Sequence, residues 1–237
     1  MKSLLPLSVA LLALLAGRPA SAHDLWLEET GRGWVLFYGH ADGQSHGGAP
    51  PAAYPAERIL SVARFDDRGA PVTGESAGAY PIPIDARCAA CCLLVSSGYW
   101  TKTIDGMRNL PKNETTGPLQ SWLSYESVKR IFRWGEALAS PLTEDLEIVP
   151  LHDPTALGPG DKLRLLVTFG GEPVEGAIVL IGGKPRGQTD GDGRINVKIR
   201  EGGPQIVQAS HRTPIESEQA DEIVRTATLH FHAGSEE

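Results

Sequence analysis

The chain has 237 residues and a formal net charge of −7 at pH 7, with 29 acidic residues against 22 lysines and arginines. An acidic surface argues against nucleic acid or anionic lipid as a partner, and it is compatible with a cation as ligand. The 27 glycines and 18 prolines alternate with segments rich in Val, Ile and Leu, a composition typical of a turn-rich β protein.

Residues 1–22 have the features of a cleavable signal peptide. Lys2 precedes an apolar run, Leu4 to Ala16, that is too short to span a bilayer, and Ala20 to Ala22 matches the small-x-small pattern cut by signal peptidase. Cleavage leaves 215 residues with a formal charge of −9, because Lys2 and Arg18 are removed. No second apolar stretch is long enough to cross a membrane, so we expect a soluble periplasmic product.

His23 becomes the first residue of the mature chain after this cleavage. An N-terminal histidine offers a metal ion its free α-amine and its ring Nδ1, which close a chelate ring. One further imidazole would complete a three-nitrogen site suited to copper, nickel or cobalt. The alternative is that the cut falls before a histidine by chance.

Two more histidines follow within 25 residues of the cleavage site. His40 ends the apolar run W-V-L-F-Y-G-H, which reads as a buried strand, and His46 lies in a loop rich in Gly and Pro. A histidine at a strand end can be presented to a metal without distorting the core. We therefore predict His40 as a second ligand, whereas His46 fits a solvated loop residue.

The C-terminal half supplies four further histidines. His211 follows the small residues Ala209 and Ser210 at a predicted strand end, and it is the third predicted metal ligand. His230 and His232 share one face of the terminal strand, where we expect them to be solvated, and His152 belongs to the connection between the two halves.

Three cysteines, Cys88, Cys91 and Cys92, lie in the sequence C-A-A-C-C. No histidine follows as in a haem-attachment motif, and no second cysteine pair is present for a tetrahedral zinc site. Because the segment continues into L-L-V-S, we expect a strand of small apolar residues with one disulfide or buried thiols; ligation of a soft metal by thiolates is the alternative.

The pattern of apolar runs and breakers predicts an all-β fold with two β-sandwich domains. The first would cover residues 23–140 and carry a long surface loop from Gly98 to Leu119; the second, residues 141–237, would be immunoglobulin-like or transthyretin-like. Ser121 to Trp134 fits either a short helix or a strand. Asp190 to Gly193 is expected to close a β-hairpin rather than to bind calcium, because the downstream bidentate acid is missing.

Several motifs along the mature chain together resemble a family of exported bacterial proteins. They are H-D-L-W-L, F-Y-G-H, S-S-G-Y-W-T-K-T, L-E-I-V-P-L-H-D-P, G-D-K-L-R-L-L-V-T-F-G-G-E-P-V-E-G-A, T-D-G-D-G-R and Q-A-S-H. The family is domain of unknown function 4198, whose members are often labelled nickel- or cobalt-uptake periplasmic components. The resemblance implies a periplasmic two-sandwich protein that handles a transition metal, with His23 and then His40 as matching positions.

Three functions remain open on the sequence alone. The first is a periplasmic protein that captures nickel, cobalt or copper and passes it to a membrane transporter. The second is a metal-free β-sandwich adaptor that docks on a cell-envelope partner through the Gly98 to Leu119 loop. The third is a copper-dependent oxidative enzyme, but no substrate groove, nucleophile elbow or H-E-x-x-H motif supports catalysis, so we expect a binding protein rather than an enzyme.

Overall fold

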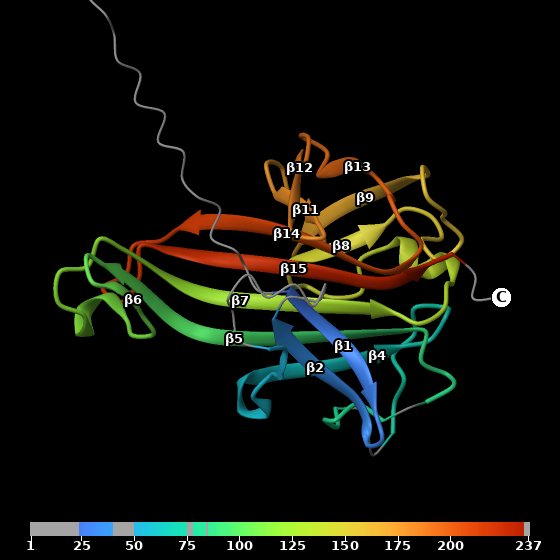
Figure 1. Ribbon diagram of the computed structural model, residues 1–237, viewed down its shortest axis with the longest axis horizontal. Coiled ribbons are helices and arrows are strands. Elements are labelled where there is room, and N and C mark those ends of the chain that lie inside the picture. Colours follow the sequence, from blue (N-terminus) through green and yellow to red (C-terminus); the bar gives the residue numbers. More distant parts are fainter. Residues whose placement is uncertain (1–23, 40–49, 75–77, 84, 235–237) are drawn as a thin grey trace, which may run out of the picture.

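The computed structural model describes residues 24–39, 50–74, 78–83 and 85–234, and in these residues the chain is all-β with three short 3₁₀ helices and no α-helix (Figure 1). The predicted signal peptide lies outside the described residues. None of the described helices is long and apolar enough to cross a membrane. The elements are β1 (Asp24–Thr30), β2 (Gly33–Gly39), β3 (Ala52–Ala53), η1 (Ala56–Arg58), β4 (Ile59–Phe65), β5 (Ala90–Thr103), β6 (Gly106–Arg108), η2 (Lys112–Glu114), β7 (Gln120–Ile131), η3 (Glu136–Ala139), β8 (Glu147–Pro150), β9 (Lys162–Phe169), β10 (Glu172–Pro173), β11 (Ile178–Ile181), β12 (Lys184–Gln188), β13 (Arg194–Lys198), β14 (Gly203–Pro214) and β15 (Glu222–Ala233).

One eight-stranded sheet contains strands from both halves of the chain, in the order β12-β11-β14-β15-β7-β5-β4, with β6 paired to β5. The β7–β15 pair is parallel and joins the two halves, whereas the other strand pairs of the three described sheets are antiparallel. The segment that fitted either a helix or a strand is therefore a strand. The order of apolar and polar residues in this segment fits both the helical period and the strand period. Its pairing with β5 and β15 makes it a strand.

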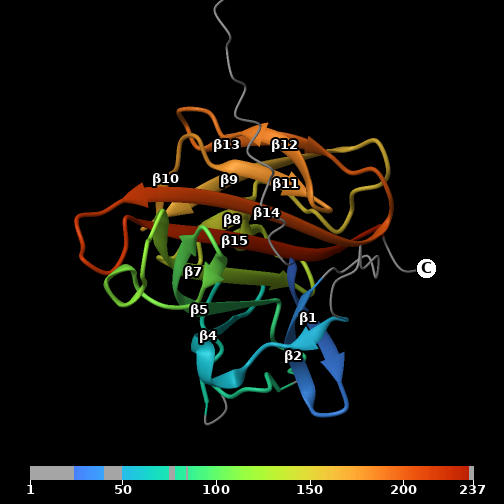
Figure 2. The same ribbon diagram turned by 60° about the vertical axis from the view of Figure 1, so that its left-hand side comes forward.

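Two smaller sheets cover the two faces of this large sheet (Figures 1 and 2). A four-stranded sheet of β8, β9, β10 and β13 packs on one face, and the antiparallel β1–β2 hairpin with β3 packs on the other. We call these the β9 face and the hairpin face. Because side chains alternate along a strand, neighbouring residues of β7 point to different faces: Val128 joins the hairpin-face core and Ile131 the β9-face core.

Two local expectations are wrong. Asp190 to Gly193 is a turn, but it does not close a hairpin, because β12 pairs with β11 in the large sheet whereas β13 pairs with β9 in the four-stranded sheet. The turn carries the chain from one sheet to the other. The Asp190 carboxylate stabilises this turn by accepting hydrogen bonds from the backbone N–H groups of Asp192 and Arg194. The expected surface loop from Gly98 begins later, because β5 continues to Thr103 and pairs there with β6.

A buried ion pair ties the large sheet to its β9-face cover. Lys129 of β7 donates to Glu147 of β8 at 2.5 Å, and only 2% and 3% of their side chains are exposed. Glu147 also accepts hydrogen bonds from the backbone N–H groups of Leu142 and Thr143 and from the Thr143 hydroxyl. The carboxylate is therefore fully hydrogen-bonded in a site that is almost entirely buried.

Lys129→Met should lower the free energy of unfolding by about 3–5 kcal/mol, because it leaves the buried Glu147 charge without its partner. Urea denaturation measures this change. The control is Arg212→Met, which removes an exposed ion pair to Glu222 and should cost about 1 kcal/mol or less. Equal losses in the two variants would contradict a structural role for the buried pair.

Candidate functional site

The two leading metal-ligand candidates, His23 and His40, lie outside the described residues, but their sequence neighbours are described. Asp24 and Gly39 are register partners at one end of the β1–β2 hairpin. Leu25 and Leu27, which follow Asp24, are 5% and 1% exposed and are anchored in the hairpin-face core. The structure therefore brings together the residues adjacent to His23 and His40.

His211, the third predicted ligand, lies elsewhere. It is half-buried on β14, where it pairs with Arg225 of β15. Side-chain alternation places it on the same face as Val207 and Ala209, which belong to the β9-face core. The structure therefore puts His211 and the β1–β2 hairpin on opposite faces of the large sheet.

A hollow of about 260 Å³ lies near His211, between the large sheet and its β9-face cover. Arg225 lines it, with its guanidinium carbon 4.3 Å from the centre of the Phe169 ring, and Tyr125 of β7 lines it as well. Asp145 is another lining residue; burial raises its pKa and the Arg225 charge opposes this rise. Because Arg225 and Asp145 carry opposite charges, the lining of the hollow favours neither an anionic nor a cationic ligand.

The hairpin face carries a row of polar residues on four adjacent strands. Arg64 of β4 pairs with Cys91 of β5, Cys91 pairs with Arg130 of β7, and Arg130 pairs with His230 of β15. Neighbouring strands are about 4.8 Å apart, so each side chain in this row is next to the following one. We call Arg64, Cys91, Arg130 and His230 the cross-strand row.

Arg130 lies beside two aromatic rings, Trp34 of β2 and Phe132, which directly follows β7. Its guanidinium carbon is 5.7 Å from the Trp34 ring centre and 5.8 Å from the Phe132 ring centre, and the two rings are themselves 4.7 Å apart. Trp34 is fixed by backbone hydrogen bonds in both directions with Ile82. Gly33 permits this close approach: it has φ +119°, and a Cβ there would be 2.4 Å from the Ile82 carbonyl oxygen.

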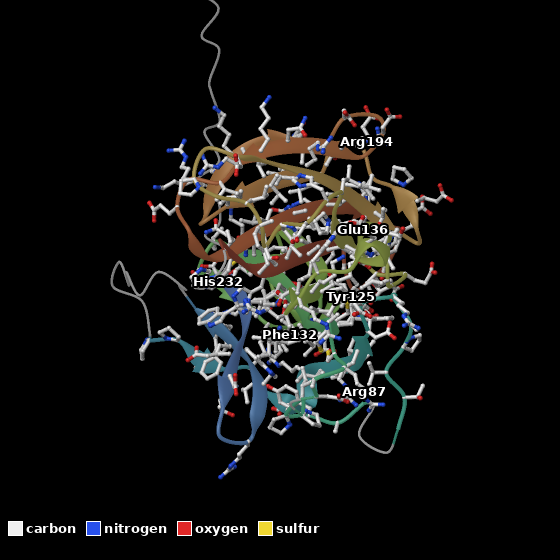
Figure 3. The ribbon with its side chains drawn as sticks, turned by 90° about the vertical axis from the view of Figure 1, so that its right-hand side faces the viewer. Arg87, Tyr125, Phe132, Glu136, Arg194 and His232 are labelled. Atoms are coloured by element: carbon white, nitrogen blue, oxygen red, sulfur yellow. The ribbon has the colours of Figure 1, made fainter. Side chains whose placement is uncertain are left out.

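His230 is a buried neutral imidazole. It is 5% exposed, and its Nδ1 has no hydrogen-bond partner in the described part of the chain. Burial, and then the positive charge of Arg130, lower the pKa of His230 to about 3. His232, two residues further along β15, points to the side of the sheet that carries β1 and β2 (Figure 3).

The prediction that His230 would be solvated at the edge of the fold is wrong. β15 is a central strand between β14 and β7, and β1 of the hairpin contacts it on the face to which His230 points, so His230 is covered rather than exposed. Arg130 was not among the site residues predicted from the sequence. Its place directly before the segment I-F-R-W was the only local indication of a special role. The rest of the row could not be seen locally, because the partner strand with His230 lies about 100 residues further along the chain.

The three cysteines are buried free thiols, which is one of the two structural alternatives expected from the sequence; the other was a disulfide. Cys88 and Cys91 belong to the hairpin-face core, and burial raises the pKa of both thiols. Cys92 points to the other face, beside the Lys129 and Glu147 pair, and burial raises its pKa as well. Within the described ranges, no three His, Cys, Asp or Glu side chains are grouped so that they could hold a metal ion.

Comparison with known proteins supports the resemblance seen in the motifs. A family model described as a domain of unknown function matches residues 20–213. The chain belongs to the DUF4198 family. The matched part of this DUF4198 chain includes His23, His40 and His211 and ends before β15, so His230 lies outside it. No curated protein and no solved structure matches the chain.

Protonation of His230 should make the protein less stable in acid. Its pKa is about 3 in the folded state and close to 6.5 in the unfolded state, so between these values only the unfolded chain binds the proton. Lowering the pH from 6 to 4 should therefore cost wild type about 2 kcal/mol more than it costs His230→Gln, as measured by urea denaturation at each pH. Parallel pH profiles for the two proteins would contradict a neutral buried imidazole.

Proposed function

We propose that this protein is an exported, periplasmic transition-metal-binding protein. Its ligands are the mature N-terminal amine and imidazole of His23, together with the imidazole of His40. The observation that carries the proposal is the register pair Asp24 and Gly39, since one is adjacent to His23 and the other to His40. Two ligands predicted from separate sequence segments are thereby attached to the same end of one hairpin.

The anchoring of β1 also supports a preorganised site. A flexible N-terminus loses conformational freedom when its amine and imidazole bind a metal. Here Asp24 is already paired with Gly39, and Leu25 and Leu27 are buried directly after it. The chain is thus fixed within one residue of the proposed chelate, which reduces the entropy lost on binding.

The donor set indicates the class of metal. An amine and two imidazoles are nitrogen ligands suited to Cu²⁺, Ni²⁺ and Co²⁺, and intrinsic affinity follows the order Co²⁺ < Ni²⁺ < Cu²⁺. Nickel or cobalt would be preferred over copper only through site geometry or supply. A membrane metal transporter is the proposed recipient of the ion.

One surface feature favours a second candidate, the envelope adaptor. The β5–β6 hairpin and the segment that follows it expose large apolar side chains: Ile104 is 86% exposed, Leu119 62%, Met107 45% and Leu110 43%. Exposed apolar side chains that gather in one region are typical of protein contact sites. The adaptor would use this region to dock on a cell-envelope protein, with or without a bound metal.

The division into two β-sandwich domains, 23–140 and 141–237, stays a prediction. In that division, β7 would belong to the first domain and β15 to the second. The two sandwiches would then share the large sheet through the β7–β15 pair, in addition to the chain that connects them.

Metal titration of protein that starts at His23 tests the main proposal. We expect one equivalent of Cu²⁺ or Ni²⁺ to bind, and we expect affinity to fall at least about tenfold when Ala is added before His23 or when His40 is replaced by Ala, because each change removes a nitrogen ligand. His211→Ala is the matched control. It should bind like wild type, because His211 lies on the opposite face of the sheet. Binding that survives both the added residue and His40→Ala would overturn the proposed ligand set.

Metal affinity should also depend on pH. The amine and both imidazoles bind metal only when deprotonated, so protons compete with the metal as the pH falls through about 8 to 6. Isothermal titration at pH 8, 7 and 6 should show steadily weaker binding. Constant affinity over this range would instead indicate oxygen ligands.

A further inference from the structure

The cross-strand row contains two arginines, of which only one faces a counter-charge. Arg64 is 3.7 Å from the Asp85 carboxylate. Arg130 is on the other side of Cys91 in the same row, and no carboxylate among the described residues lies within ion-pair distance of it. Burial keeps the Cys91 thiol protonated by raising its pKa, so Cys91 supplies no negative charge.

Arg130 is charged but incompletely hydrogen-bonded. Burial lowers its pKa to about 10, which still leaves the guanidinium protonated at neutral pH. Its Nε and Nη1 atoms are buried and have no hydrogen-bond partner in the described part of the chain. Trp34 and Phe132 interact with the cation through their rings, but aromatic rings do not replace the oxygen acceptors that guanidinium N–H groups require.

His230 adds a polar atom to the same place without supplying a counter-charge. It is the register partner of Arg130, it is 95% buried, and its Nδ1 also has no hydrogen-bond partner among the described residues. A buried cation costs stability unless an anion accompanies it, and buried N–H groups cost stability unless they find acceptors. A metal ion would not meet these requirements, because the Arg130 charge repels it.

We propose that Arg130 and His230 form a binding site for a small oxyanion, a carboxylate or a phosphate-like group. The anion would accept hydrogen bonds from the Arg130 guanidinium and the His230 imidazole, beside the Trp34 and Phe132 rings. This site is separate from the proposed amine and imidazole chelate, and it does not depend on that chelate being correct. It adds an anionic ligand to a protein whose overall charge is negative.

Anion titration of metal-free protein at low ionic strength tests the proposal. Acetate and phosphate are added separately, and the NMR signals of the Arg130 Nε–H group and the His230 imidazole are followed. At least one of the two anions should shift both signals saturably and raise the thermal midpoint, because it binds only the folded state. Acetate alone would assign the site to carboxylates, and phosphate alone to phosphate-like groups. Sodium chloride at matched ionic strength should reproduce neither effect.

Arg130→Met should weaken binding at least about tenfold, because it removes the charge and the donors together. Arg212→Met is the matched control: Arg212 also lies against an aromatic ring, that of Trp122, but it is exposed and already paired with Glu222, so its loss should leave anion binding unchanged. If Arg130→Met does not fold, Arg130→Lys keeps the charge with fewer donors and should bind more weakly than wild type.

Three results would overturn the proposal: no saturable shift with either anion in wild type, an equal shift with chloride, or full binding by the folded Arg130 variant. In each case Arg130 would be a structural cation held by its aromatic neighbours alone. None of these results bears on the His23 chelate, which is measured with metal and a different set of variants.

Discussion

The parallel pairing of β7 with β15 is the constraint on which the rest of this structure depends. The register runs from Trp122 with Glu222 to Arg130 with His230, and it joins strands from the two halves of the chain in one sheet. Parallel strands are normally buried on both faces, and here each face has its own cover, the four-stranded sheet on one side and the β1–β2 hairpin on the other. Without this pair, β15 would be an edge strand and Arg130 and His230 would not be neighbours.

Burial on both faces places the two adjacent cationic side chains of β7, Lys129 and Arg130, in different surroundings. Lys129 and Arg130 are adjacent in sequence but point to opposite faces, because side chains alternate along a strand. Lys129 meets Glu147, a carboxylate that is fully hydrogen-bonded. Arg130 meets two aromatic rings and a neutral imidazole. Lys129 is therefore paired with a counter-charge within the described structure, whereas Arg130 has a positive charge that suits an external anion.

Local patterning predicted what depends on local chemistry. The all-β class, the DUF4198 family and the buried cysteine segment follow from composition, turn residues and motifs, all of which can be read over short windows. The strand identity of β7, the switch of sheets between β12 and β13, and the burial of His230 depend on which distant strand is the neighbour. Alternation along one strand specifies two faces, but it does not say what covers either of them. The proposed anion site could not be predicted from the sequence, because Arg130 and His230 become neighbours only when strands about 100 residues apart pair with each other.

The β1–β2 hairpin is the element that both proposed sites share. Its paired end, Asp24 with Gly39, is attached to His23 and His40, and its other end contributes Trp34 to the surroundings of Arg130. The two proposed sites differ in the charge of their ligands, since one is proposed for a metal cation and the other for an oxyanion. A hairpin can serve both because Leu25, Leu27 and Leu36 fix it to the large sheet through apolar contacts that do not depend on either ligand. The apolar core thus sets the position of the hairpin, and with it the position of each of its ends relative to the proposed ligand residues.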